Sequence, residues 1–338
     1  MTAASPAQSL DISMRPAWQA ELARAFKTPL ELAEYLGLDP ELVAQHQAAR
    51  ELFPMLVPRP FADLMKPGDI NDPLLRQVLP QQAEFEAATG FITDPLAEHD
   101  AVIPGLLHKY PSRVLVLFRG GCAVNCRYCF RRHFPYADNT LGKSQRQQVL
   151  AYVQAHPELN EVILSGGDPL MANDSAIIAF AQALANIPHV KRLRIHSRLP
   201  IVIPQRLVTQ LANDLIATGL QIILVLHANH AQEISPALVD GLSTWRQAGV
   251  TLLNQSVLLK GVNDHAETLA VLSERLFAAQ VLPYYLHVLD RVAGASHFLV
   301  EDAEALQLMQ QLRTQLPGFL VPKLVREEAG ELSKTPLV

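Results

Sequence analysis

The sequence predicts an α/β protein built on a partial, open-sided barrel of six βα units that follows a mostly helical region. Three observations predict it. From residue 113 onward, apolar strand-like runs alternate with amphipathic stretches of helical length. There are six such runs, too few for a closed eight-stranded barrel. The 338 residues are enough to bury a large core. Such folds place their chemistry at the carboxyl ends of the strands, where we expect the site.

The individual elements follow from apolar periodicity. Before the barrel, apolar residues recur at helical spacing over 20–26, 29–35 and 40–52. We expect strands at 113–119, 161–165, 192–196, 221–227, 251–258 and 283–289, and covering helices at 174–186, 204–218, 236–248 and 264–279. The expected regions are helical at 1–105, the barrel at 106–300, and a C-terminal helix with a terminal segment at 301–338.

Composition limits the class of function. The chain is 49% hydrophobic and 18% charged, with a formal net charge of -5. These values exclude a disordered chain and a nucleic-acid surface held by bulk positive charge. The sequence shows no signal-peptide pattern and no apolar run near the roughly 18 residues that cross a bilayer. We expect a cytoplasmic protein whose partners are small molecules or a folded protein, with no nucleic acid and no membrane.

The three cysteines lie together in CAVNCRYC, as Cys122, Cys126 and Cys129, just after the first expected strand. Thiolates suit an iron-sulfur cluster or zinc. A structural zinc site is closed by four protein ligands, and His133 would complete a Cys3His site in a non-catalytic metal-binding module. A [4Fe-4S] cluster on three cysteines leaves one iron open to an outside ligand.

The C-x3-C-x2-C spacing, with Tyr128 before the last cysteine, resembles the signature of the radical S-adenosylmethionine (SAM) superfamily. The resemblance implies that the open iron binds the amino and carboxylate groups of S-adenosylmethionine. An electron donor then drives its cleavage to a radical.

Further motifs follow later strands of the expected barrel. Gly166, Gly167 and Asp168, after the second strand, resemble the glycine-rich motif that contacts the methionine amino group. Two glycines allow backbone to approach a ligand closely. By the same resemblance, His227 and Gln255 lie near the S-adenosyl ligand.

The flanking sequence makes the resemblance closer. FRRH after Cys129, and the segments HKYPSRVLVLF, IHSRLPIVIPQR, HANHAQEIS, NQSVLLKGVND, PYYLHVLD and SKTP, resemble lysine 2,3-aminomutases over roughly residues 100 to 338. That family implies an isomerase with pyridoxal 5'-phosphate (PLP) as a second cofactor. Lys334 matches the lysine that holds PLP as a Schiff base, so the terminal segment should fold into the barrel mouth. Arg113 and Lys109 match the cofactor's phosphate ligands, with Lys109 where an arginine is usual.

The family also implies the substrate contacts. Arg131 matches the residue for the substrate carboxylate, and Asp290 and Glu327 match two acids for the ε-ammonium of lysine. Two acids disfavour glutamate but leave another amino acid, such as arginine, open. The family has aspartate where this chain has Glu327.

Two departures indicate a branch of the family. Besides the change at Glu327, the chain stops at Val338, whereas the free-lysine enzymes continue into a segment with more cysteines. Both features resemble the shorter bacterial branch that supplies β-lysine for modification of elongation factor P by a partner ligase. The N-terminal region is expected to cover the barrel or to form the interface of a homo-oligomer.

Overall fold

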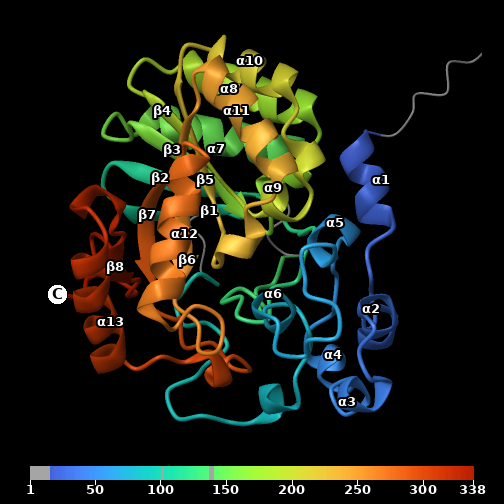
Figure 1. The fold of residues 1–338 in the computed structure, drawn as a ribbon. Coiled ribbons are helices and arrows are strands. Elements are labelled where there is room, and N and C mark those ends of the chain that lie inside the picture. Colours follow the sequence, from blue (N-terminus) through green and yellow to red (C-terminus); the bar gives the residue numbers. More distant parts are fainter. Residues whose placement is uncertain (1–15, 100–102, 137–140) are drawn as a thin grey trace, which may run out of the picture.

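A computed structural model describes residues 16–99, 103–136 and 141–338 (Figure 1). The first 15 residues of the predicted N-terminal region therefore lie outside the described residues. In the part that is described, nine strands form one open sheet in chain order, from β1 at one edge to β9 at the other. No helix of this part is long and apolar enough to cross a membrane.

The six predicted barrel strands are confirmed, and their ends differ from prediction by no more than two residues. They run parallel, each paired with the next along the chain. They are β2 (Arg113–Arg119), β3 (Glu161–Gly166), β4 (Arg192–Ser197), β5 (Gln221–Leu226), β6 (Thr251–Val257) and β7 (Leu282–His287).

Three further strands were not predicted. β1 (Leu106–Tyr110) pairs antiparallel with β2, and β9 (Thr335–Pro336) pairs antiparallel with β8. Between β7 and β9, β8 (Lys323–Arg326) continues the barrel as a seventh parallel strand. A strand of two or four residues is too short to show a period of its own, which is why sequence missed β8 and β9. The division of the chain at residues 105 and 300 stays a prediction.

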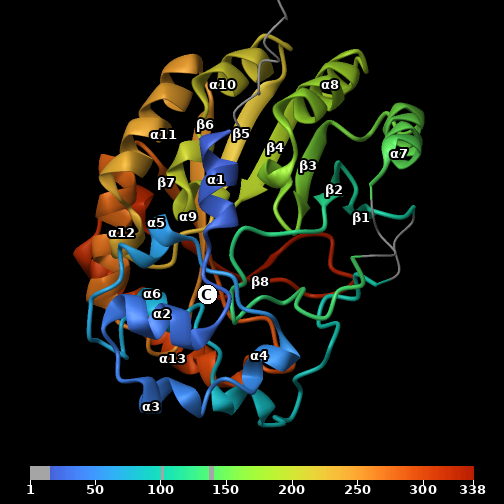
Figure 2. The ribbon, with the colours of Figure 1, turned by 90° about the vertical axis from the view of Figure 1, so that its right-hand side faces the viewer.

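Helices cover the outer face of the sheet (Figure 2). The predictions at 174–186, 236–248 and 264–279 are confirmed. The prediction at 204–218 is wrong in its first residues, where a separate 3-10 turn precedes α10. The two are separated by Leu207 and Val208, whose ψ values of 70° and 121° are not helical. Sequence missed α7, in which only Val149 and Val153 are buried. The helices are α7 (Lys143–Ala155), α8 (Asp174–Ala185), α9 (Leu199–Val202), α10 (Thr209–Ile216), α11 (Pro236–Ala248), α12 (Ala266–Ala278) and α13 (Asp302–Gln315), with short turns η2 (Pro169–Met171), η3 (Pro204–Arg206), η4 (Ala231–Glu233), η5 (Ser296–Phe298) and η6 (Gly318–Leu320).

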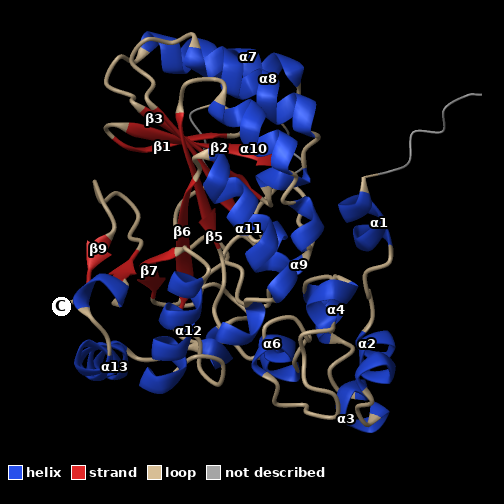
Figure 3. Cartoon of the chain, turned by 45° about the horizontal axis from the view of Figure 1, so that its top comes forward, coloured by secondary structure: helices blue, strands red, loops and turns tan. Residues whose placement is uncertain are grey.

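The N-terminal region is a group of short helices beside the barrel, as Figures 1 and 3 show. Proline at the first helical position and aspartate or threonine caps begin several of them. The prediction at 20–26 is wrong at its end, because Phe26 instead bridges to Val57. The prediction at 40–52 is two helices. The elements are α1 (Ala17–Ala23), α2 (Pro29–Leu36), α3 (Pro40–Ala44), α4 (Ala49–Leu52), α5 (Arg59–Ala62), α6 (Pro73–Arg76) and η1 (Gln82–Phe85).

The N-terminal helices and the barrel share one hydrophobic core. Leu32 and Phe61 belong to the same buried cluster as Leu164 and Leu193 of the sheet. We expect this sharing to fix the position of the N-terminal layer, since burial of apolar side chains contributes about 1.5–3 kcal/mol each. The layer therefore covers the barrel, one of the two roles expected for it.

Candidate active site

One cavity of about 500 Å³ runs along the inside of the barrel. Alternate residues of each strand line it, because successive side chains point to opposite faces of a sheet. On β4, for example, Arg192, Arg194 and His196 line the cavity, whereas Leu193 and Ile195 are buried on the other face. Every residue predicted for the site lines this cavity except Lys109.

The cavity reaches further than the sequence indicated. Arg113 is the first residue of β2, at the amino end of the strand, while the cysteines follow its carboxyl end. The expectation that all site residues gather at the carboxyl ends is therefore wrong for Arg113. The strand itself spans about 20 Å, so the site extends along the barrel interior.

The cysteine loop is a compact turn open to this cavity. The amide of Cys129 donates to the carbonyl of Cys126 at 3.0 Å, and all three cysteines are partly exposed residues that line the cavity. Burial raises the pKa of Cys122 well above its ordinary value and that of Cys129 to about 11, and neighbouring thiols add to both shifts. Binding of iron would therefore release protons from these thiols.

The two glycines of the glycine-rich motif pack against the cysteine loop. The amides of Gly167 and Asp168 donate to the carbonyls of Arg119 and Gly121, at 2.7 and 2.9 Å. A Cβ at Gly166, whose φ is +120°, would lie 2.4 Å from the carbonyl oxygen of Arg119, and one at Gly167 would lie 2.6 Å from that of Gly121. The sequence predicted that these two glycines let backbone approach a ligand closely. In the structure, the backbone that they approach is that of the cysteine loop.

The carboxylate of Asp168 accepts several hydrogen bonds from other residues of the chain. It accepts from the backbone amides of Leu170, Arg198 and Leu199 and from the hydroxyl of Ser197, at 2.8–3.0 Å. Burial raises its pKa to about 6, against the opposing effect of these donors. Asp168 therefore joins the ends of β3 and β4, and its predicted contact with S-adenosylmethionine stays a prediction.

Neutral histidines line the middle of the cavity. Gln255 contacts the Nε2 atom of His227 and lies 3.4 Å from Nδ1 of His196. Burial lowers the pKa of His227 to about 3 and that of His196 well below its ordinary value, and nearby cations add to both shifts. His227 and Gln255 are thus brought together as a polar, uncharged pair.

A buried ion cluster ties the cysteine loop to the N-terminal layer. Arg127, between two of the cysteines, donates from Nε to Glu84 at 2.8 Å and from Nη1 to the carbonyl of Phe53 at 2.7 Å. Arg132 donates to the same carboxylate at 2.7 Å. The backbone amides of Asn125 and Arg127 also bond to this layer.

Glu84→Ala is expected to lower the free energy of unfolding by about 3–5 kcal/mol, because it leaves two buried guanidinium groups without their carboxylate. Urea denaturation of the two proteins measures the difference. Glu86→Ala, at an exposed site two residues away, is the matched control and should change little. Equal stability of Glu84→Ala and the parent protein would contradict the role given to this cluster.

The C-terminal hairpin brings Glu327 and Lys334 together. β8 and β9 pair Arg326 with Thr335 in antiparallel register. Glu327, which follows Arg326, therefore lies opposite Lys334, which precedes Thr335. The ammonium of Lys334 contacts the carboxylate of Glu327, which also accepts from the hydroxyl of Tyr110 at 2.7 Å. Although burial opposes it, this ion pair holds the pKa of Glu327 at about 2. The terminal segment thus lies against the cavity, as expected from the sequence.

Arg131 and Lys109 share a carboxylate that the sequence analysis did not single out. Glu98 accepts from Nε and Nη2 of Arg131 at 2.6 and 3.1 Å, and from Lys109 at 2.9 Å. Burial would raise the pKa of Glu98, but the two cations outweigh it and lower the pKa. Arg131 also donates to Ser165 and Gly166, which leaves one of its five N–H groups for another partner.

Arg113 and Asp290 are two further ionisable residues that line the cavity. The guanidinium of Arg113 lies 4.1 Å from the ring centre of Tyr110, and within the described ranges it has no carboxylate partner. Burial raises the pKa of Asp290 to about 7, against the attraction of Lys334. An unpaired guanidinium suits an anion such as a phosphate, and a carboxylate suits a cation.

The residues fit the cofactors expected from the sequence. Three cysteines that line one cavity suit a [4Fe-4S] cluster, and Lys334 and Arg113 on the same cavity suit PLP. For the Cys3His alternative, Nε2 of His133 lies 3.1 Å from the carbonyl oxygen of Ala293. Over the described ranges, no three His, Cys, Asp or Glu side chains, the three cysteines included, form a group placed to hold a metal ion.

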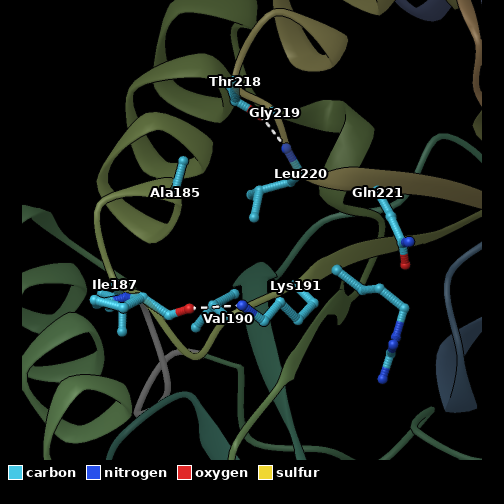
Figure 4. A pocket seen from close by; sticks show the side chains of 10 residues that line it. Ala185, Ile187, Val190, Lys191, Thr218, Gly219, Leu220 and Gln221 are labelled. Atoms are coloured by element: carbon cyan, nitrogen blue, oxygen red, sulfur yellow. Dashed lines mark hydrogen bonds between the residues drawn. The ribbon is translucent and has the colours of Figure 1, made fainter.

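A second cavity, of about 430 Å³, lies at the amino ends of β4 and β5 (Figure 4). Two of its polar groups bond to near neighbours in the chain. Lys191 donates to the carbonyl of Pro188 at 2.9 Å, and the amide of Leu220 donates to Thr218 at 3.3 Å. None of the predicted site residues lines it, and we assign it no ligand.

Comparison with known proteins finds relatives that match nearly the whole chain. Residues 116–272 match the Radical SAM superfamily. The chain is 55% identical over 97% of its length to the L-lysine 2,3-aminomutase of Escherichia coli (strain K12) and covers 96% of that protein. It is 50% identical to that of Haemophilus influenzae, covering 94% of both chains, and 33% identical to that of Clostridium subterminale, covering 95% of this chain and 77% of the relative.

Proposed function

Because the chain belongs to the L-lysine 2,3-aminomutase family of the radical SAM superfamily, we propose that it converts L-lysine to β-lysine with PLP as its second cofactor. The observation that carries this proposal is the single cavity shared by the three cysteines, Lys334 and Asp290. A cluster site, a lysine for PLP and an acid for an ammonium group thus face the same space.

The chain's own residues bind and orient the reactants. Cys122, Cys126 and Cys129 hold the cluster, and Lys334 holds PLP. Gly166, Gly167, Asp168, His227 and Gln255 form the surroundings of S-adenosylmethionine. When bound, the cluster and S-adenosylmethionine would supply radical chemistry for removing a substrate hydrogen, and PLP would supply a carrier for the amino group.

Cations of the cavity hold the anionic groups. Arg113 pairs with no carboxylate among the described residues and suits the phosphate of PLP. Lys109, outside the cavity lining, adds positive charge beside Glu98 and Glu327. Arg131 binds the substrate carboxylate through the N–H that Glu98, Ser165 and Gly166 leave free.

Acids at the same cavity receive the ε-ammonium of lysine. Asp290 lines the cavity and forms no ion pair within the described residues, so its carboxylate can accept the ammonium of the substrate. Glu327 contacts Lys334 and stabilises its ammonium form when PLP is not bound to this lysine. A second carboxylate lowers the cost of burying the cationic substrate.

The dependence of kcat/KM on pH should report Asp290. Its pKa of about 7 means that the carboxyl group is protonated, and unable to bind an ammonium, as the pH falls below that value. We therefore expect kcat/KM for lysine to fall about tenfold per pH unit below pH 7. Asp290→Asn should have a low kcat/KM without this limb. Parallel profiles for the two proteins would contradict the assignment.

Incubation of the reduced enzyme with lysine, arginine and glutamate in separate reactions tests the choice of substrate. Chromatography of the β-amino acids should show product from lysine and none from glutamate, because the acids at the cavity repel a second carboxylate. Faster turnover of arginine than of lysine would reassign the substrate.

The product's use follows from the resemblance to the shorter bacterial branch. We propose that β-lysine made in the cytoplasm is attached to elongation factor P by a partner ligase. The high identity to relatives of similar length supports this branch. Mass spectrometry of elongation factor P, incubated with the reaction product and the ligase, should show addition of one β-lysine. Preference of the ligase for unreacted lysine would contradict it.

A further inference from the structure

A buried arginine lies against one of the three cysteines. Arg198 directly follows β4, and its Nη1 atom lies 3.2 Å from the sulfur of Cys126. Its Nη2 atom donates to the side-chain oxygen of Gln77 at 2.8 Å and lies 3.4 Å from the carboxylate of Glu233. Only 7% of the residue is exposed. The guanidinium is therefore held between the cysteine and two fixed acceptors.

The acceptors are themselves fixed from two directions. Gln77 follows α6 in the N-terminal layer, is fully buried, and donates to Glu233 at 3.0 Å. Asn229, after β5, donates to Gln77 at 2.9 Å and to the hydroxyl of Tyr128 at 2.7 Å. The N-terminal layer thus sets the position of Arg198 relative to the cysteine loop.

The charge of Arg198 persists in this environment. A guanidinium stays protonated inside proteins, and here the carboxylate of Glu233 lies 3.4 Å from it. Its guanidinium carbon also lies 5.5 Å from the ring centre of Tyr128. A permanent positive charge next to a ligand sulfur favours the more negative state of an iron-sulfur cluster.

We infer that Arg198 raises the reduction potential of the cluster by donating to the sulfur of Cys126, and that Gln77 is the positioning residue that holds it there. One-electron reduction adds one negative charge to the cluster, and the donated hydrogen bond stabilises that charge. The inference rests on the proposed assignment of the three cysteines as cluster ligands. It gives the N-terminal layer a part in setting how easily the electron donor reduces the enzyme.

The midpoint potential of the reconstituted cluster, measured without S-adenosylmethionine, tests this inference. Electron paramagnetic resonance during a redox titration gives the potential, and iron and sulfide analysis gives the cluster content. Arg198→Gln should keep the iron and show a lower potential than the parent protein. Arg198→Lys keeps the charge and should shift less. Gln77→Ala should shift in the same direction as Arg198→Gln.

Arg206 provides the matched control. It is also fully buried and paired with a carboxylate, that of Asp174, but it bonds to the carbonyl of Leu170 and to no cysteine. Arg206→Gln should therefore leave the potential unchanged.

An unchanged potential in Arg198→Gln, or an equal shift in Arg206→Gln, would overturn the inference. So would a change confined to the affinity for S-adenosylmethionine. If Arg198→Gln fails to retain iron, Arg198→Lys and Gln77→Ala decide the question by the same comparison. A parent protein that binds no iron-sulfur cluster would instead refute the proposed function itself.

Discussion

Lys334→Ala is expected to abolish β-lysine formation, to below about one thousandth of the parent rate, as for loss of a group that bonds covalently to a cofactor. The absorbance of bound PLP should disappear with it. Iron content should stay at the parent level, because Lys334 lies on the C-terminal hairpin and the cysteines follow β2. Absorption spectra, iron analysis and product chromatography measure the three quantities.

Two variants separate the covalent role from charge and folding. Lys334→Arg keeps a cation beside Glu327 but cannot form a Schiff base, so it should be as inactive as Lys334→Ala. Lys323→Ala removes an exposed lysine from β8 of the same hairpin and should retain activity and PLP. Bound PLP with its usual absorbance in Lys334→Ala would refute the role of this lysine.

Gly167→Ala is expected to lose most of the cluster. The added Cβ would lie 2.6–2.7 Å from backbone atoms of Gly120 and Gly121, and backbone cannot yield as a flexible side chain can. The cysteine loop must then shift, at a cost of about 1–3 kcal/mol typical of overpacking. Iron and sulfide analysis after anaerobic reconstitution should show far less than one cluster per chain.

Gly318→Ala controls for the substitution itself. A Cβ at this position meets nothing within 4 Å, so iron content and activity should match the parent protein. A Gly167→Ala protein that holds a full cluster would show that the contact between the two loops is not needed to shape the cluster site.

Periodicity predicted the six barrel strands and most of the helices that cover them. Motif spacing and the resemblance to the family predicted the site residues. Strands such as β2 and helices such as α11 are long enough for their period to be visible, and CAVNCRYC is a local pattern. The cavity then gathers Cys122, Arg113, Asp290 and Lys334 from distant parts of the chain. These four could be predicted because each lies in a segment that resembles the family.

Residues that act through tertiary contacts could not be predicted. Glu98 lies in a segment without periodicity, and only the fold brings it within 2.6 Å of Arg131. The contact between Glu327 and Lys334 depends on the two-residue strand β9, which leaves no trace in the sequence pattern. Arg198 lies in the segment IHSRLPIVIPQR, but nothing in that segment indicated a role for it. Its partner Gln77 comes from the N-terminal layer, which carries no motif.

The most direct test of the account follows the migrating nitrogen. Anaerobically reconstituted, reduced protein is incubated with S-adenosylmethionine, PLP and L-lysine that carries ¹⁵N in its α-amino group, and the product is analysed by nuclear magnetic resonance. The account predicts β-lysine with the label on carbon 3. A protein that holds one zinc ion and leaves both S-adenosylmethionine and lysine unchanged would contradict it.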